Sequence, residues 1–278
     1  MKGVIIAGGK GKRLRPLTDN LPKPMVPLLN KPVMEYSIDL LKQHGITSIA
    51  ITTHYLSKNI KDYFGDGSRL GVSLSYFHEN QPMGTAGGIQ NAKDFLNEPF
   101  IVVSGDILTD INLTEAIQYH LEKGALLTIL LKEVENPLQY GLVQTDDKGI
   151  VCRFLEKPLE WEDVFTNTVN TGIYIVSPNI FSYWGSETFY DFSHDLFPKL
   201  IENKEGLYGF LCNGYWSDIG CYERYRQTEL DLLESKVKVK VVGKPPTYGF
   251  IRRRMTQKKY KVRINKSMFT ALRMSHKK

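Results

Sequence analysis

The sequence predicts an α/β fold built around a mostly parallel central sheet. Three observations support this prediction. Short apolar runs alternate along the chain with segments of helical periodicity. Several of these runs are continuously apolar, as strands buried on both faces are. The 278 residues, 42% of them hydrophobic, suffice for one large domain with a substantial core.

The first hundred residues contain a strand–helix series. Val4 to Ala7 is an apolar run typical of a buried strand. We then expect helices at 33–44, 57–64 and 86–96, and strands at 48–52, 72–77 and 100–103. Successive strands that are joined by helices run parallel, since the crossover returns the chain to its starting edge.

The rest of the chain is expected to be richer in strands. We predict helices at 113–123, 178–184, 193–202 and 222–233, and strands at 125–134, 141–145, 150–154, 169–176 and 208–212. Asp146-Asp147-Lys148-Gly149 is a turn sequence that predicts a hairpin. Pro198 lies inside one predicted helix.

The first strand leads into a loop with glycines and cations, Gly8-Gly9-Lys10-Gly11-Lys12-Arg13-Leu14-Arg15-Pro16-Leu17-Thr18. Glycines let backbone N–H groups approach an anion closely. Lys23 lies between two prolines, which hold its backbone extended. Prolines at 16, 22, 24 and 27 exclude a long helix after the turn, so the loop is not a dinucleotide fingerprint. It predicts a polyphosphate site; the alternative is a tight turn with a solvated basic rim.

Charge is distributed unevenly along the chain. Residues 236–278 contain 15 Lys and Arg and no Asp or Glu, which leaves 21 basic and 30 acidic residues in 1–235. The net charge of +6 therefore comes from the tail, and a uniform nucleic-acid-binding surface is not expected. No apolar run is long enough to span a membrane, and the chain begins directly with a strand rather than a signal peptide. Three cysteines without metal spacing are typical of a reducing, cytoplasmic setting.

The loop and the following Pro22-Lys23-Pro24 resemble the signature of the sugar-1-phosphate nucleotidylyltransferases, or NDP-sugar pyrophosphorylases. The resemblance covers residues 1–234, with six motifs in the family's order. It implies the nucleotide-diphospho-sugar transferase fold, a Rossmann-like, three-layer α/β/α architecture with a mixed, mostly parallel central sheet. We therefore expect a catalytic domain at 1–235 and a basic extension at 236–278 that lacks β-helix repeats. Three interpretations of the extension stay open: a poorly ordered or partly packed segment, a basic arm that binds nucleic acid or anionic lipid, or the product of an altered reading frame. Lys12 departs from the family, where many relatives have Thr.

Two aspartates follow short apolar segments. The strand at 100–103 ends in Ser104-Gly105-Asp106, and Asp218 lies in Trp216-Ser217-Asp218-Ile219-Gly220. A carboxylate at the end of a central strand suits a hard cation between protein and phosphates. The alternative for Asp106 is a cap for the helix at 113–123. The resemblance implies that both aspartates hold Mg²⁺.

The segment from Gln81 to Ala86 lies where ligands bind in open α/β sheets, after a strand and before a helix. Gln81 or a main-chain amide could read a base edge there; a flexible helix start is the alternative. The resemblance makes this segment the nucleobase loop, and its Gly84-Thr85-Ala86-Gly87 form favours the guanylyltransferase branch.

Further motifs point to a sugar phosphate. Glu156-Lys157-Pro158 matches the family without change and implies that Lys157 binds the phosphate and Glu156 the sugar hydroxyls. Asn170 can donate and accept. A surface ion pair is the alternative for the Glu–Lys pair, and a turn role for Asn170.

The resemblance implies transfer of a nucleotidyl group from a nucleoside triphosphate to a sugar 1-phosphate, with release of pyrophosphate. The expected site comprises catalytic Arg13, Lys23 and Lys157; nucleotide-binding Ala7, Gly8, Gly9, Gly11, Lys12, Gln81, Gly84 and Thr85; sugar-binding Gly141, Glu156, Asn170 and Trp216; and metal-binding Asp106 and Asp218. We expect GTP and mannose 1-phosphate first, then dTTP or UTP and glucose 1-phosphate. A non-catalytic, nucleotide-sugar-binding relative is the alternative, although such a relative is expected to lose Arg13, Lys23 or a metal aspartate. We expect a homo-oligomer that binds neither membrane nor nucleic acid, with the role of the basic tail left open.

Overall fold

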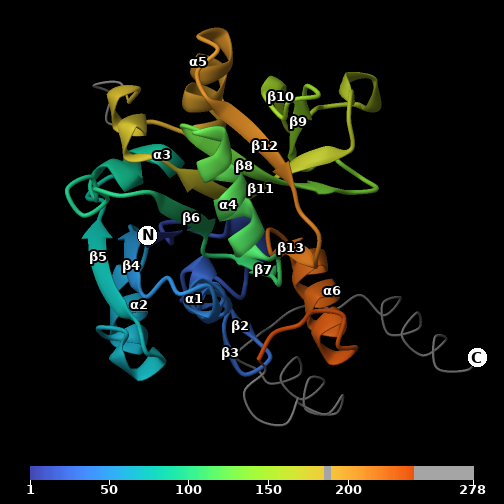
Figure 1. Ribbon diagram of the computed structural model, residues 1–278. Helices are drawn as coiled ribbons and strands as arrows, with labels where there is room; N and C mark the ends of the chain where they lie inside the picture. Colours follow the sequence, from blue (N-terminus) through green and yellow to red (C-terminus); the bar gives the residue numbers. More distant parts are fainter. Residues whose placement is uncertain (185–188, 241–278) are drawn as a thin grey trace, which may run out of the picture.

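The computed structural model describes residues 1–184 and 189–240, and its central feature is a nine-stranded mixed sheet (Figure 1). The strands are β1 (Lys2–Ile6), β4 (Ser48–Thr53), β5 (Ser73–His78), β6 (Phe100–Ser104), β8 (Leu127–Glu133), β9 (Gly141–Thr145), β10 (Val151–Glu156), β11 (Thr168–Val176) and β12 (Leu207–Leu211). Their order is β10-β9-β11-β6-β1-β4-β5, with β8 between β11 and β12. Every strand of this sheet except β10 and β11 runs in one direction, which confirms the mixed, mostly parallel sheet.

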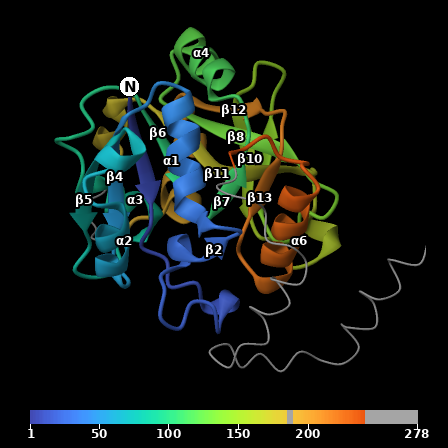
Figure 2. The ribbon, with the colours of Figure 1, turned by 90° about the horizontal axis from the view of Figure 1, so that it is seen from below.

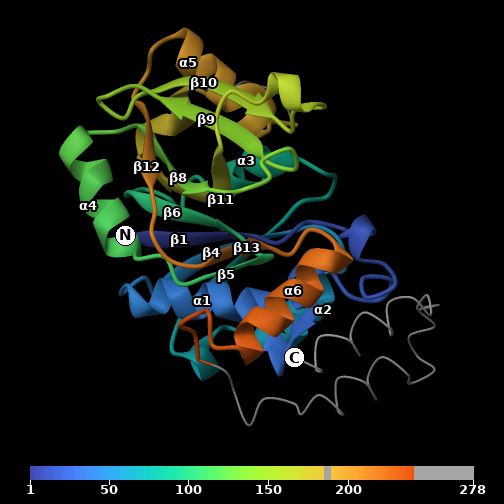
Figure 3. The same ribbon diagram turned by 90° about the vertical axis from the view of Figure 1, so that its right-hand side faces the viewer.

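Helices cover both faces of the sheet, as Figure 3 shows for α1 and α2 on one side and α3 and α5 on the other. The helices are α1 (Val33–Gln43), α2 (Ser57–Phe64), α3 (Gly84–Gln90), α4 (Leu113–Lys123), α5 (Phe197–Glu202) and α6 (Tyr222–Leu233). Ile38, Phe64 and Leu113 from α1, α2 and α4 belong to one buried apolar cluster, while Ile89 of α3 and Leu200 of α5 belong to another. Burial of both sheet faces explains the continuously apolar strands and confirms the three-layer prediction.

A third apolar cluster anchors the glycine loop. Leu14 is fully buried and packs with Val26, with Val33 at the start of α1 and with Tyr225 of α6. Figure 2 shows α1 in front of the sheet and α6 beside β13 (Trp216–Asp218). Leu14 therefore fixes the loop to the body, while its neighbours Lys12 and Arg13 stay exposed.

The expected break after the glycine loop is present, because the chain forms short 3₁₀ helices there, at Lys12–Leu14 and Lys23–Met25. The extended backbone expected for Lys23 is wrong, since Pro22 is extended and Lys23 begins the second 3₁₀ helix. Other 3₁₀ helices are Ser68–Leu70, Trp161–Asp163 and Pro178–Ser182, the last in place of the helix predicted at 178–184. A two-stranded ribbon, β2 (Pro27–Leu28) with β3 (Lys31–Pro32), leads into α1.

Two predicted helices differ from the structure. The helix expected at 86–96 begins earlier, at Gly84, and ends at Gln90, because bonds of the i to i+3 type close turns beyond it. The helix expected at 193–202 is divided into a π-helical turn, Phe192–Leu196, and α5. Pro198 has no N–H to donate, so it occupies the first turn of a new helix rather than a helix interior.

Two strand pairs were not predicted, the β2–β3 ribbon and a second short pair. β7 (Ile107–Thr109) pairs antiparallel with β13, so that Asp218 lies opposite Ile107, and the N–H of Ile219 donates to the carbonyl of Asp106 at 3.0 Å. Strands of three residues leave too short a pattern to recognise. This pair brings the two aspartates together, although they are far apart in the chain.

Residues 241–278, most of the predicted basic extension, lie outside the described residues. Its first residues pack on the body: Val237 is buried, and the N–H of Lys238 donates to Asp110 at 2.8 Å. Within residues 1–184 and 189–240, no helix is long and apolar enough to cross a membrane.

Candidate active site

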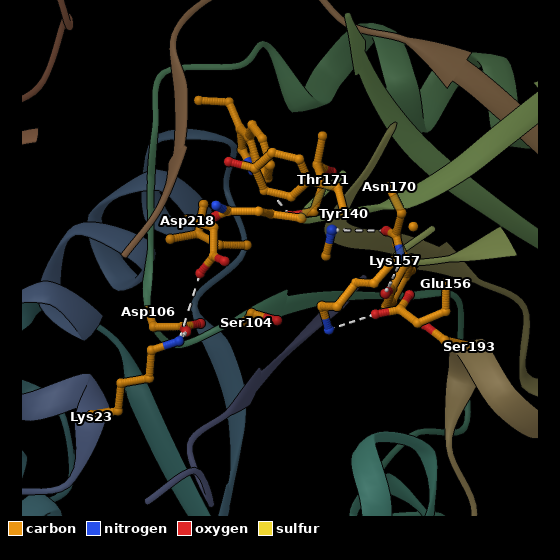
Figure 4. Close-up of a pocket in the computed structure, with 16 residues that line it drawn as sticks. Lys23, Ser104, Asp106, Tyr140, Glu156, Lys157, Asn170, Thr171, Ser193 and Asp218 are labelled. Carbon is orange, nitrogen blue, oxygen red and sulfur yellow. Dashed lines mark hydrogen bonds and ion pairs between the residues drawn. The ribbon is translucent and has the colours of Figure 1, made fainter. Parts of the chain in front are cut away.

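A cavity of about 210 Å³ lies beyond the carboxyl end of β6. Eight of the predicted site residues line it: Lys23, Asp106, Gly141, Glu156, Lys157, Asn170, Trp216 and Asp218. Eight residues outside the prediction complete the lining: Ser104, Ile107, Gln139, Tyr140, Thr171, Gly172, Tyr174 and Ser193. Figure 4 shows Lys23, Asp106 and Asp218 on one side of this cavity and Glu156 with Lys157 on the other.

Lys23 holds the two aspartates on its side of the cavity. Its ammonium forms an ion pair with Asp106 and lies 3.6 Å from Oδ1 of Asp218. All three side chains are mostly shielded, with 15%, 17% and 32% of their surface exposed. The helix cap that was the alternative for Asp106 is supplied instead by Asn112, whose side chain accepts from Thr114 N at 3.1 Å.

The glycine loop is folded against Lys23. Gly11 has a φ of +64°, and a Cβ there would lie 2.8 Å from the methyl group of Thr18 and 3.0 Å from Cβ of Lys23. The hydroxyl of Thr18 donates to the carbonyl of Gly11 at 2.7 Å, and Lys23 N donates to Gly9 at 3.4 Å. Gly11 is therefore required for the close approach of the loop to the lysine backbone.

Arg13 belongs to the same group of charges. A Cβ on Gly220 would lie 2.9 Å from Oδ2 of Asp218 and 3.3 Å from Nη2 of Arg13, so both side chains face this glycine. Burial lowers the pKa of Lys23; Asp218 opposes this effect, and the positive charges of Arg13 and Lys157 add to it. Cations from two segments far apart in the chain, Arg13 with Lys23 and Lys157, thus lie close enough to act on one another, as a site for a polyanion requires.

The opposite wall is built by the β9–β10 pair. Lys157 lies 2.7 Å from Oε1 of Glu156, and Glu156 lies opposite Gly141 in the pair. A Cβ on Gly141 would be 2.8 Å from Oε2 of Glu156 and 2.8 Å from the ring of Phe154, so a larger residue there would displace the Glu156 carboxylate or the Phe154 ring. The lysine side chain is 55% exposed and can turn from the glutamate toward a ligand.

The remaining wall comes from the start of β11. Asn170 accepts from Gly172 N at 2.9 Å and donates to the hydroxyl of Tyr174 at 3.1 Å, which fixes the orientation of its amide. Trp216 donates from its indole to the carbonyl of Thr171 at 3.0 Å. These bonds hold one amide, one phenol and one indole at the surface of the cavity.

Tyr174 was missed by the sequence prediction. It lies four residues after Asn170 in the same strand, and the even spacing in a strand is a signal that could have found it. The irregular pairing of β11 with β8 between these residues weakens that signal.

The base loop, residues 81–87, lies outside this cavity. Gln81 lines a second cavity with residues of β5 and its end, among them Tyr76 and His78. A Cβ on Gly84 would lie 2.5 Å from the carbonyl oxygen of Tyr190, and the hydroxyl of Thr85 donates to Asp191 at 2.8 Å. Gln81, Gly84 and Thr85 are therefore not among the residues that line the cavity containing Lys23.

Glu79 joins the glycine loop to the base loop and was also missed. Its side chain accepts from Met83 N at 3.1 Å, and its Oε1 would be 2.4 Å from a Cβ on Gly88 and 3.5 Å from one on Gly8. Burial raises the pKa of Glu79. A carboxylate directly after a strand, the signal that identified Asp106, also applied here.

The two aspartates suit a divalent cation. Within the described residues, no cluster of three or more His, Cys, Asp or Glu side chains gathers as a metal centre. Asp106 and Asp218 nevertheless converge on one point of positive charge, the ammonium of Lys23. Two carboxylates beside a phosphate site are the donors that Mg²⁺ takes, with the remaining positions left to water and substrate oxygens.

The model of the nucleotidyl transferase family matches residues 2–235. The chain belongs to this family. It is 41% identical over 252 residues to UTP–glucose-1-phosphate uridylyltransferase of Synechocystis, with 86% of this chain and 65% of that protein covered. It is 34% identical over 232 residues to mannose-1-phosphate guanylyltransferase of Mycobacterium tuberculosis, with 83% and 64% covered. The chain spans just under two thirds of the length of these curated relatives.

Solved structures agree with the fold. HddC from Yersinia pseudotuberculosis, in a complex with GMP-PN, has a TM-score of 0.72 and 28% identity, covering 83% of this chain and 99% of HddC. A UDP-glucose pyrophosphorylase in complex with UDP-glucose has a TM-score of 0.71 and 23% identity, covering 84% and 98%. The predicted family and fold class are therefore confirmed.

Proposed function

We propose that this protein is a sugar-1-phosphate nucleotidylyltransferase. The observation that carries the proposal is the gathering of Lys23, Asp106 and Asp218 on one side of a cavity that has Lys157 on the other. A phosphate oxygen of the sugar 1-phosphate attacks the α-phosphorus of the nucleoside triphosphate. The bond from that phosphorus to the bridging oxygen breaks, and pyrophosphate leaves with the electron pair. No protein nucleophile is needed, so positioning and charge neutralisation supply most of the catalysis.

The cations have distinct roles in this proposal. Lys23 and Arg13 bind the triphosphate and stabilise the leaving pyrophosphate. Lys157 leaves its ion pair with Glu156 and binds the phosphate of the incoming sugar. Its positive charge lowers the repulsion between the sugar phosphate and the triphosphate. The main-chain amides of the glycine loop add donors to the phosphates, and Lys12 on the same loop is exposed beside them.

The donor set supports a magnesium-dependent reaction. Asp106 and Asp218 would hold Mg²⁺, which in such sites neutralises phosphate charge and fixes phosphate geometry. Lys23 then moves from the carboxylates to the phosphate oxygens. Glu156, Asn170 and Trp216 would bind the sugar.

Two substrate pairs have specific support. The Gly84-Thr85-Ala86-Gly87 sequence and the mannose-1-phosphate guanylyltransferases among the relatives favour GTP with mannose 1-phosphate. The 41% identical uridylyltransferase favours UTP with glucose 1-phosphate. We place the guanosine pair first, and retention of Arg13, Lys23 and both aspartates favours an active enzyme over a non-catalytic, nucleotide-sugar-binding relative. A homo-oligomeric state and a cytoplasmic setting stay predictions.

The test is a panel of GTP, UTP, dTTP and ATP crossed with mannose 1-phosphate and glucose 1-phosphate in the presence of Mg²⁺. Pyrophosphate release is measured, and the nucleotide sugar is identified by mass spectrometry. At least one pair should turn over, and EDTA should abolish the reaction until Mg²⁺ is restored. Release with no pair would favour the non-catalytic alternative.

A further inference from the structure

Residues 190–193 connect the base loop to the cavity. Tyr190 N donates to the carbonyl of Met83 at 2.9 Å, and the carbonyl of Tyr190 accepts from Ala86 N at 3.0 Å and Gly87 N at 2.8 Å. These backbone bonds join two segments that lie about a hundred residues apart in the chain. The base loop and residues 190–193 therefore form one hydrogen-bonded unit.

The side chain of Asp191 lies at the centre of this unit. Its Oδ2 accepts from the hydroxyl of Thr85 at 2.8 Å and from Thr85 N at 3.4 Å. Its Oδ1 accepts from Ser193 N at 2.8 Å and His194 N at 3.4 Å. Phe192 N donates back to the hydroxyl of Thr85 at 3.0 Å. One carboxylate oxygen thus faces the base loop, and the other holds the turn that carries Ser193.

That turn forms part of the cavity wall. Ser193 lines the cavity, where Figure 4 shows it near Glu156. Phe192 is buried, and its ring centre lies 4.6 Å from that of Tyr174, which lines the same cavity. Hydrogen bonds and packed rings thus connect Thr85 to both Ser193 and Tyr174.

We propose that Asp191 is a positioning residue that couples the binding of the two substrates. A nucleotide on the base loop fixes the position of Thr85. Through its hydrogen bonds to Thr85 and Ser193, Asp191 then fixes the part of the cavity wall that receives the sugar phosphate. The affinity for the sugar phosphate rises when nucleotide is bound, and the reverse holds by the same factor. This inference rests on the proposed function, because it assigns the two ligands to the two ends of the unit.

The test measures the dissociation constant of the sugar phosphate with and without nucleotide. Calorimetry with Mg²⁺ uses the α,β-methylene analogue of GTP with mannose 1-phosphate, and that of UTP with glucose 1-phosphate, so that no reaction occurs. In the unaltered protein, nucleotide should tighten sugar phosphate binding about fivefold or more. Thr85→Val and Asp191→Asn should each reduce this factor to less than about twofold, and the double variant should lose no more than either alone.

Two controls separate coupling from a loss of folding. Thr85→Ser keeps the hydroxyl and should keep the coupling. Asn112→Ala removes the cap of α4, outside the cavity lining, and should leave the coupling factor unchanged even if stability falls. If neither pair of ligands binds the unaltered protein, the proposed function and this inference both fail. If the ligands bind without coupling, or if coupling persists in both Thr85→Val and Asp191→Asn, this inference alone fails.

Discussion

Replacement of Asp218 by Asn tests the charge arrangement at the centre of the proposed site. The change keeps the shape of the side chain and the backbone pairing of β13 with β7, but it removes one negative charge. A unit charge at the observed 3.6 Å from Lys23 interacts by about 5 kcal/mol at an effective dielectric constant of 20. During the reaction Asp218 would hold Mg²⁺ in place of the ammonium, and an interaction of the same order applies to that cation. Since Asp218 is 32% exposed, solvent reduces this to roughly 3 kcal/mol, which corresponds to about 100-fold in rate.

We therefore expect kcat to fall at least about 100-fold in Asp218→Asn, while circular dichroism and the melting temperature stay close to those of the unaltered protein. Asp110→Asn is a matched control, because Asp110 directly follows β7 and accepts from Tyr215 N at 2.6 Å outside the cavity. That variant should lose stability but keep kcat within about twofold. Pyrophosphate release by Asp218→Asn within about threefold of the unaltered rate would refute the assignment of Asp218.

Three further predictions follow from the geometry and the charges. Gly141→Ala places a Cβ 2.8 Å from Oε2 of Glu156, an overlap that costs roughly 1–3 kcal/mol. The KM for the sugar phosphate should therefore rise about tenfold, while the KM for the nucleotide stays unchanged. Equal changes in both KM values would contradict this prediction. Because the pKa of Lys23 is lowered and its ammonium is required, kcat/KM for the nucleotide should fall with rising pH already below the usual lysine value of 10.5, and a profile flat to that pH would oppose the role. Burial lowers the pKa of His120 to about 4 in the folded protein. As the pH falls through 6.5, the imidazole is therefore protonated in the unfolded chain but not yet in the folded one. The free energy of unfolding should drop by about 2 kcal/mol between pH 7 and 4.5. Urea unfolding of His120→Gln should lack this part of the pH dependence.

Eight residues predicted for the site line one cavity, and short segments of the chain carry the patterns that predicted them. The glycine loop, Lys23 between prolines and Glu156-Lys157-Pro158 each combine a backbone constraint with a charge in a few adjacent residues. The strand–helix series likewise predicts the sheet, since hydrophobic periodicity is local. Such patterns do not give the distance between segments. The sequence therefore left structural roles open as alternatives to ligand binding: a helix cap for Asp106, a turn for Asn170 and a surface ion pair for Glu156 with Lys157.

Local patterns of apolar, glycine and charged residues were enough to predict the fold class, the family and the chemical types of the candidate site residues. Tertiary structure decided which residues meet. The short β7–β13 pair places Asp218 beside Asp106, and packing of Leu14 fixes the loop that carries Arg13. Asp191 contacts Thr85 across about a hundred residues, and no local pattern records that contact. Hydrogen bonds and ion pairs depend on the distance between groups in space, and for groups far apart in the sequence only the folded structure sets that distance.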